Sequence, residues 1–368
     1  LLCGAVWFQY LSLQYLWPEK YKKISCCYLV LVCCNLPMIM YSSFVYGEIP
    51  SFTALSVGCY LLLRLLGSSS RILFTGFGSI LFLTLSVLLR KNSLIPVIAV
   101  LLVLLFEALR PGRNGKMRLG LLIMAVCLAV TSVGILPLVQ KCYEKKAGNT
   151  LSSGVTAMSY LAMGMQEASR GCGWDNGFNI DTYDTADERL TYFREHPGYT
   201  ADFYLHKHLS QWADGTYASR QATLATYGGR SAFFKEVYEG SLSGGYIEWC
   251  NAWQNVLYLG VLVFCIGSLK KRRKSKVVGH MADQTAGHTA GCTADHMADQ
   301  LGADRHGADR LYIYVGLIAV LGGFLFHIFW EANSRYIFSY SLLLMPYCGA
   351  GVYTGICRIR DGVRSRFH

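Results

Sequence analysis

The sequence predicts an all-α, polytopic membrane protein: a bundle of about nine transmembrane helices with a mostly helical extracytoplasmic loop domain. Of its 368 residues, 53% are hydrophobic and only 15% are charged. This composition, with a positive mean hydropathy, excludes an ordinary soluble domain. A bilayer core about 30 Å thick needs roughly 17–25 apolar residues per helix. The runs that approach this length are residues 1–17, 25–46, 52–67, 72–89, 94–109, 118–139, 252–269, 311–330 and 336–356.

Three of these runs are short for a span. Residues 52–67, 72–89 and 94–109 fit either tilted hairpin helices or partly re-entrant segments. The first run opens at Leu1 with neither an initiator Met nor a basic segment, which is unlike a native start or a signal peptide. We therefore expect the chain to be the C-terminal part of a longer protein, with any functional groups on earlier helices out of view.

Lysines and arginines gather in four clusters beside the apolar runs. They lie at residues 20–23, 110–118, 270–276 and 358–366. If the runs alternate in direction, all four clusters fall on one side, which the positive-inside rule makes cytoplasmic. The net charge of +11 then reflects topology, and no nucleic-acid partner is expected. We expect a multi-pass protein of the cell membrane, with the loop 140–251 extracytoplasmic and the C-terminus cytoplasmic.

This alternation also sets the expected domain organisation. Residues 279–310 repeat HMADQ and GADR and hold almost no large apolar side chains, so we expect disorder there. The predicted segments are 1–139, transmembrane helices; 140–251, the extracytoplasmic loop domain; 252–269, a transmembrane helix; 270–310, a basic and low-complexity disordered linker; 311–356, a C-terminal transmembrane hairpin; and 357–368, a basic cytoplasmic tail.

Two amphipathic helices are predicted in the outer loop. Residues 183–196 and 199–212 carry apolar side chains near helical spacing, and Pro197-Gly198 separates them. The preceding loop contains Trp174, a ring too large to leave exposed without purpose. Asp175 and Asp181 of that loop are open to two readings, as contacts to a sugar or acceptor or as turn residues and helix caps.

The stretch from His327 to Tyr340 places charges at a membrane edge. Glu331 and Arg335 stand in a gap of a few residues between two long apolar runs. A hairpin needs only turn residues there, so a carboxylate, a guanidinium and several aromatic rings favour recognition of a charged, ring-bearing ligand. The alternative is an interfacial aromatic belt with one ion pair.

Cations at residues 90–92 break the positive-inside trend. Arg90 and Lys91 fall on the outer face, where an anionic lipid phosphate would explain them. Otherwise they merely snorkel from a shallow hairpin. No hydrolase, metalloprotease or nucleotide-binding fingerprint stands out, and no metal-ligand spacing emerges, so no metal or cofactor is expected.

The outer-face polar groups could converge on one cavity. They comprise Tyr46 and Glu48, residues 90–92, the outer loop, and Glu331 with Arg335. A cationic, aromatic cavity suits a polyprenyl-phosphate-linked sugar, because cations hold phosphate, aromatic rings stack on sugars, and carboxylates bind hydroxyls.

Several stretches carry a family resemblance. They are WEANSRYIFSYSLLLMPY at 330–347 with the preceding His327, FVYGEIPS at 44–51, LLRKNSLIPVIAVLL at 88–102, GWDNGFNID at 173–181 and LSQWADGTY at 209–217. Together they span most of the chain, and the chain resembles the C-terminal portion of bacterial GT-C-type membrane glycosyltransferases related to the protein O-mannosyltransferases.

The resemblance implies a GT-C-like bundle with its active site on the outer face. The expected partners are a polyprenyl-phosphate sugar donor, membrane lipids, and a glycan, teichoic acid or protein acceptor. The catalytic acid of the first external loop would precede Leu1, so the catalytic residue is unknown here and this chain by itself is expected to be inactive. Lys91 and Arg335 would lie nearest the lipid phosphate, with Glu331 orienting Arg335.

The expected site residues fall into two groups. Donor-phosphate binding is assigned to Arg90, Lys91, Asn92 and Arg335. The substrate cavity is assigned to Tyr46, Glu48, Trp174, Asp175, Asp181, Trp212, Asp214, His327, Glu331 and Tyr336.

A different class of function stays open. A transporter, flippase or non-catalytic envelope assembly protein could also carry an outer loop that binds a partner. Transporters more often place ionisable residues at mid-bilayer on repeat-related helices. Here Arg64 and Glu107 lie near the ends of their runs, and no internal repeat of helices is apparent, which favours the transferase reading.

Overall fold

The computed structural model describes residues 1–41, 47–67, 72–151, 157–171, 184–220, 231–285 and 311–365. Within these residues the fold is all-α, with 14 α-helices and no strand. The longitudinal helices are α1 Leu2–Leu16, α2 Tyr21–Cys34, α3 Leu36–Tyr41, α4 Glu48–Gly67, α5 Ile72–Leu89, α6 Leu94–Leu109, α7 Gly115–Ala147, α13 Ser243–Thr285, α15 Val315–Phe329 and α16 Ile337–Arg364. The remaining helices are α8 Ala157–Gly164, α9 Asp184–Glu195, α10 Pro197–Ala213 and α12 Ala232–Tyr238.

Six helical segments of the described chain are long and apolar enough to cross a membrane. They are Glu48–Gly67, Lys91–Leu109, Gly115–Ala147, Ser243–Leu269, Leu311–Phe329 and Ser334–Arg364.

Three of the nine predicted runs do not reach this standard. The run 1–17 forms the 15-residue α1, and α5 contributes the shorter apolar stretch Phe74–Leu89. The run 25–46 is broken at Asn35, whose side-chain oxygen accepts a hydrogen bond from Met38 N at 3.0 Å. An asparagine that caps a new helix in this way ends the preceding one, because it satisfies an amide that has no partner inside the helix.

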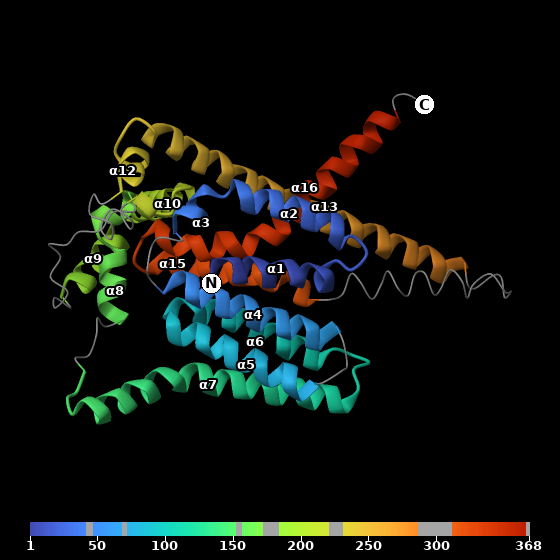
Figure 1. Cartoon of the computed structure of the whole chain (residues 1–368), viewed down its shortest axis with the longest axis horizontal. Helices are drawn as coiled ribbons and strands as arrows, with labels where there is room; N and C mark the ends of the chain where they lie inside the picture. The colour runs from blue at the N-terminus through green and yellow to red at the C-terminus, as the bar shows by residue number, and fades with distance from the viewer. Residues whose placement is uncertain are drawn as a thin grey trace.

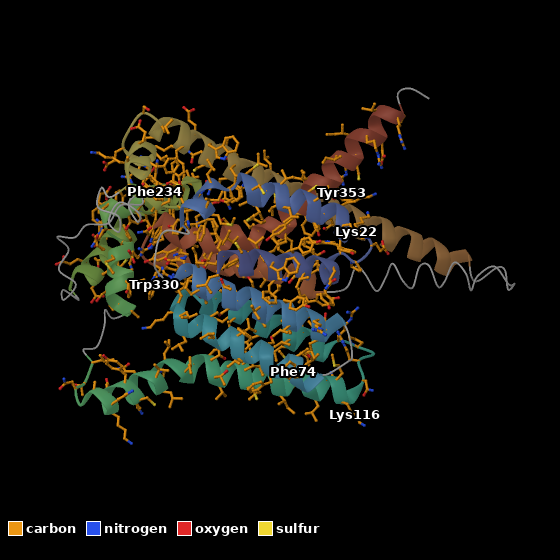
Figure 2. All side chains as sticks on the ribbon, in the orientation of Figure 1. Lys22, Phe74, Lys116, Phe234, Trp330 and Tyr353 are labelled. Carbon is orange, nitrogen blue, oxygen red and sulfur yellow. The ribbon has the colours of Figure 1, made fainter. Side chains whose placement is uncertain are left out.

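The long helices lie side by side along one axis, and α8, α9, α10 and α12 gather at one end of the bundle (Figure 1). Lys22 and Lys116, from two of the basic clusters, lie at the other end (Figure 2). Trp330 and Phe234 lie at the end that carries the short helices. The fold thus separates the predicted outer loop from these basic residues by the length of the bundle.

The first half of helix α16 is buried, and the helix packs on α2, α13 and α15. Its contact with α13 depends on glycine: a Cβ at Gly351 would lie 1.8 Å from the carbonyl oxygen of Gly260. Small residues let two helix backbones approach where any larger side chain would hold them apart. This close packing fixes the middle of α16 against α13.

The two helices predicted in the outer loop are confirmed, as α9 and α10. Pro197 is the first residue of α10, where its missing N–H costs nothing. The long helices continue past the predicted loop boundaries, since α7 ends at Ala147 and α13 begins at Ser243.

Helix α13 continues to Thr285, through the first residues of the segment predicted as a linker. Extending an existing helix costs far less than starting one, and Lys and Arg are good helix formers. The rest of the linker lies outside the described residues.

Candidate functional site

A charged cluster lies where α4 begins, on the end of the bundle that carries the short helices. Glu48 is the first residue of α4, where a carboxylate is favoured by the helix dipole. Its side chain is 3% exposed. The Nη2 atom of Arg90 lies 2.9 Å from Glu48 Oε1, and Nε of Arg335 lies 3.6 Å from the same oxygen. One carboxylate thus bridges two guanidinium groups that are 245 residues apart in sequence (335 − 90).

The close approach of α4 to the end of α5 depends on Gly47. A Cβ there would lie 2.7 Å from the carbonyl oxygen of Leu89, so only glycine fits. One turn into α4, Ser51 donates to the carbonyl of Ser86 at 2.8 Å and lies 2.6 Å from the hydroxyl of Ser93. These contacts hold the turn that carries Arg90 against the helix that carries Glu48.

Tyr336 lies between the two arginines. The guanidinium carbon of Arg90 is 5.7 Å from its ring centre and that of Arg335 is 5.6 Å away, both within cation–π range. The Tyr336 hydroxyl donates to Glu331 Oε2 at 2.7 Å. The imidazole of His327 stacks on the same ring at 5.3 Å and an interplanar angle of 11°. The sequence predicts that Glu331 orients Arg335; in the structure Arg335 pairs with Glu48, and Glu331 contacts Tyr336.

Glu48, the two arginines and Tyr336 line a small pocket of about 20 Å³. That space is enough for a water molecule but not for a sugar phosphate. Its polar lining residues are Glu48, Ser51, Arg90, Asn92, Ser93, Arg335, Tyr336, Ser339 and Tyr340. Both arginines that line this pocket are paired with Glu48.

The segment after α10 is tied to the start of α16 through Asp214. One carboxylate oxygen accepts hydrogen bonds from the backbone N (2.9 Å) and hydroxyl (2.6 Å) of Thr216, and the other from Ala218 N at 3.1 Å. The hydroxyl of Ser334 donates to Asp214 Oδ2 at 2.5 Å. The bonds to the main chain hold a tight turn in which Ala218 adopts a φ of 55°. Asp214 is therefore a structural link between the outer loop and the residue before Arg335.

Lys207 gives α10 a second anchor. Its side chain is fully buried, and Nζ donates to the carbonyls of Gly164 at 2.6 Å and Ile328 at 3.0 Å. Ile328 belongs to the last turn of α15, whose carbonyls have no partner within the helix, so a cation there is favoured. Burial, with the charge of Lys207, lowers the pKa of the neighbouring His208, whose ring stacks on Phe324 at 4.6 Å. Helix α10 is thus fastened to the bundle.

Buried polar atoms lie next to the charged cluster. Both ring nitrogens of His327, Nε1 of Trp212 and the hydroxyl of Tyr340 have no hydrogen-bond partner within the described part of the chain. The rings of Trp212 and Tyr340 stack at 5.9 Å and 21°. These atoms need a hydrogen bond from water or a ligand group, because a buried donor or acceptor without a hydrogen bond costs about 1–3 kcal/mol.

A network of ion pairs joins α9, α10 and the short 3-10 helix η2, Glu167–Gly171. Arg170 pairs with Glu167 at 3.0 Å and with Asp202, and Arg189 lies 3.5 Å from Glu167. The hydroxyl of Tyr199 donates to Glu167. This hydrogen bond is the main reason why the pKa of Glu167 is lowered, and the two arginines add to it.

The structure brings many, but not all, of the sequence-predicted site residues together. Around the pocket it places Glu48, Arg90, Asn92, Arg335 and Tyr336. His327 and Glu331 contact Tyr336, whereas Trp212 and Asp214 reach the cluster through Tyr340 and Ser334. Lys91 lies in the turn beside Arg90 with its side chain exposed. The predicted residues Tyr46, Trp174, Asp175 and Asp181 lie outside the described residues.

Sequence reasoning missed Ser51, Ser93, Tyr340 and Lys207. Ser51 and Tyr340 carried a usable signal, because they follow Glu48 and Tyr336 by three and four residues, on the same helix face. Lys207 carried none, since a lysine in an amphipathic helix is normally solvated. Within the described ranges, no three His, Cys, Asp or Glu side chains are grouped so as to hold a metal ion.

No protein-family model, no curated protein and no solved structure matches the chain.

Proposed function

We propose that this protein is an integral membrane glycosyltransferase of the GT-C type, which moves a sugar from a polyprenyl-phosphate donor to a cell-envelope acceptor at the outer membrane face. The observation that carries the proposal is the pair of arginines from distant parts of the sequence, held around Glu48 and against Tyr336 at one end of an apolar bundle. Paired guanidinium groups bind phosphate oxygens in a planar, two-pronged geometry that lysine cannot supply.

The orientation of the bundle supports an outer-face site. Lys22 and Lys116 lie at the end opposite α8, α9, α10 and α12, and basic residues of multi-pass proteins concentrate on the cytoplasmic side. The candidate site then faces the extracytoplasmic side, at the depth where lipid phosphates lie. In this proposal α1, the broken pair α2–α3 and α5 complete a set of about nine spans.

The chemistry assigned to the cluster is stabilisation of a leaving group. In sugar transfer an acceptor hydroxyl gives its proton to a general base and its oxygen forms a bond to the anomeric carbon. The bond from that carbon to the lipid phosphate breaks, and the phosphate leaves with the bonding electrons. Arg90 and Arg335 neutralise this charge from fixed positions, which lowers the barrier because no reorganisation is needed at the moment of reaction. Lys91, exposed in the next residue, approaches the phosphate from the membrane surface. Glu48, displaced by the phosphate, becomes available to a sugar hydroxyl.

Aromatic rings complete the donor site. Tyr336 and Tyr340 border the pocket, and the unpartnered atoms of His327, Trp212 and Tyr340 offer hydrogen bonds to hydroxyls of sugar or acceptor. An aromatic ring can stack its apolar face on a sugar ring while its polar atom forms a hydrogen bond to a hydroxyl.

The test is a paired assay on membranes that contain the protein expressed from its complete coding sequence. Polyprenyl-phosphate sugar labelled in the sugar is supplied at the outer face, and release of the lipid phosphate is followed beside movement of the labelled lipid across the bilayer. We expect release of the lipid phosphate with transfer of the label, abolished by Arg335→Ala while insertion in the membrane is unchanged. Lipid movement without cleavage of the sugar–phosphate bond would assign the protein to the flippases instead.

A further inference from the structure

A second cavity lies at the basic end of the bundle, between α6, α13, η3 (Leu311–Tyr314) and the first turn of α15. Its volume is about 670 Å³, within the range of sites that bury small organic ligands. Most of its lining is apolar or aromatic: Phe106, Leu109, Leu269, Leu311, Tyr314 and Leu317. The cavity is therefore suited to hydrocarbon and lies at the opposite end of the molecule from the Glu48 cluster.

One wall of this cavity is charged. Glu107, only 2% exposed, pairs with Arg113 and lies 3.8 Å from Arg110. Two guanidinium groups therefore face one carboxylate, which leaves one positive charge in excess. Arg118 fixes the turn that carries them, because its Nε donates to the carbonyl of Ala108 at 2.8 Å. Arg110 itself lines the cavity, and its side chain is 27% exposed. Its guanidinium group is therefore accessible to an anion that enters the cavity.

The position along the bundle matches a membrane boundary. The apolar span of α13 ends at Leu269, which lines the cavity, and the sequence continues directly into KKRRKSK at 270–276. A lipid whose acyl chains contact the leucines of the cavity would place its headgroup near Arg110, at the membrane boundary where this basic run begins. Basic pockets between transmembrane helices on the cytoplasmic side recognise anionic lipid headgroups.

We propose that this cavity binds an anionic phospholipid, with acyl chain beside Phe106 and Leu317 and headgroup phosphate on Arg110. The charge excess of the wall favours an anionic over a zwitterionic headgroup. The inference does not depend on the proposed sugar transfer, since the two sites lie at opposite ends and lipid retention is measured without any sugar donor.

The experiment is native mass spectrometry of the whole chain, delipidated in detergent and then titrated with phosphatidylglycerol or with phosphatidylcholine of identical acyl chains. A basic residue near a membrane surface contributes roughly a fivefold preference for an anionic lipid. We expect phosphatidylglycerol to bind at least about fivefold more tightly than phosphatidylcholine, and Arg110→Gln to remove that preference. Arg110→Gln leaves the pair between Arg113 and Glu107 in place, so no buried carboxylate loses its partner.

Two further variants keep the test decisive. Ser268→Phe places a ring in the cavity and should reduce the binding of both lipids. Lys22→Gln removes a charge from an exposed side chain at the same end of the bundle and should change neither. Equal binding of the two lipids would overturn the proposal, as would an equal effect of Lys22→Gln and Arg110→Gln. A dimeric mass that excludes both lipids would assign the cavity to a second copy of the chain.

Discussion

Replacing Arg335 with glutamine separates phosphate binding from folding. The guanidinium is removed, yet Arg90 still lies 2.9 Å from Glu48. The buried carboxylate therefore keeps an ion pair, and the large penalty for an uncompensated buried charge is avoided. We expect the variant to insert and fold as the parent chain does.

The effect on affinity follows from the contact that is lost. A hydrogen bond to a charged group contributes about 1.5–3 kcal/mol. The Kd of the Arg335→Gln variant for polyprenyl phosphate should therefore rise about 10- to 150-fold. Polyprenol, which lacks the phosphate, should bind parent and variant alike.

Glu48→Gln should act in the opposite direction. In the free protein the Glu48 carboxylate occupies the two guanidinium groups that the phosphate needs. Removing its charge relieves that competition, and we expect phosphate binding to tighten by about fivefold, equivalent to about 1 kcal/mol for a pair between a buried carboxylate and partly exposed arginines. A purely structural role for the cluster would weaken binding in both variants.

The assay is a titration of the detergent-solubilised chain with a short-chain polyprenyl phosphate, followed by native mass spectrometry. The control is Arg364→Gln, the same change of charge on an exposed side chain in the last turn of α16. An unchanged Kd for Arg335→Gln would refute the reasoning, and so would weaker binding by Glu48→Gln.

Three other outcomes are expected. Lys207→Met should lower the free energy of opening of the outer helices by about 3 kcal/mol, because two buried carbonyls lose their donor; unchanged hydrogen exchange in α10 would contradict this. The pKa of Glu167 is lowered by the Tyr199 hydroxyl, so its contribution to stability is complete above the unfolded pKa of about 4.3 and disappears as pH falls through the folded value. Glu167→Gln should therefore make hydrogen exchange in the outer helices less sensitive to acid, and an unaltered acid profile would argue against it. Gly47→Ala, whose Cβ would lie 2.7 Å from a backbone carbonyl, should weaken polyprenyl phosphate binding, whereas Gly134→Ala, with open space around it, should not.

Much of the fold could be predicted because a membrane helix is identified by a continuous run of apolar residues in the sequence. The all-α class, several long apolar helices and both outer helices α9 and α10 follow from run length, helical spacing and Pro197. The count of spans could not be read in the same way. Asn35 lies inside an apolar run, and its effect depends on whether its side chain caps a new helix, as it does here through Met38.

For the candidate site, the sequence predicted which residues lie at the same end of the bundle. Alternating helix direction places Glu48, Arg90 and Arg335 at one end, as the structure does. Their pairing could not be predicted, because it depends on how closely α4 approaches the end of α5. Nor could the burial of Lys207, whose partner Ile328 is 121 residues away and contributes only a backbone carbonyl.

The most direct test of the central claim is the position of the phosphate in an electron cryomicroscopy structure of the chain with bound polyprenyl phosphate, solved beside the free chain. We predict phosphate density within hydrogen-bonding distance of both Arg90 and Arg335, with the Glu48 carboxylate displaced from them. Phosphate density at another place, with both ion pairs to Glu48 intact, would contradict this claim.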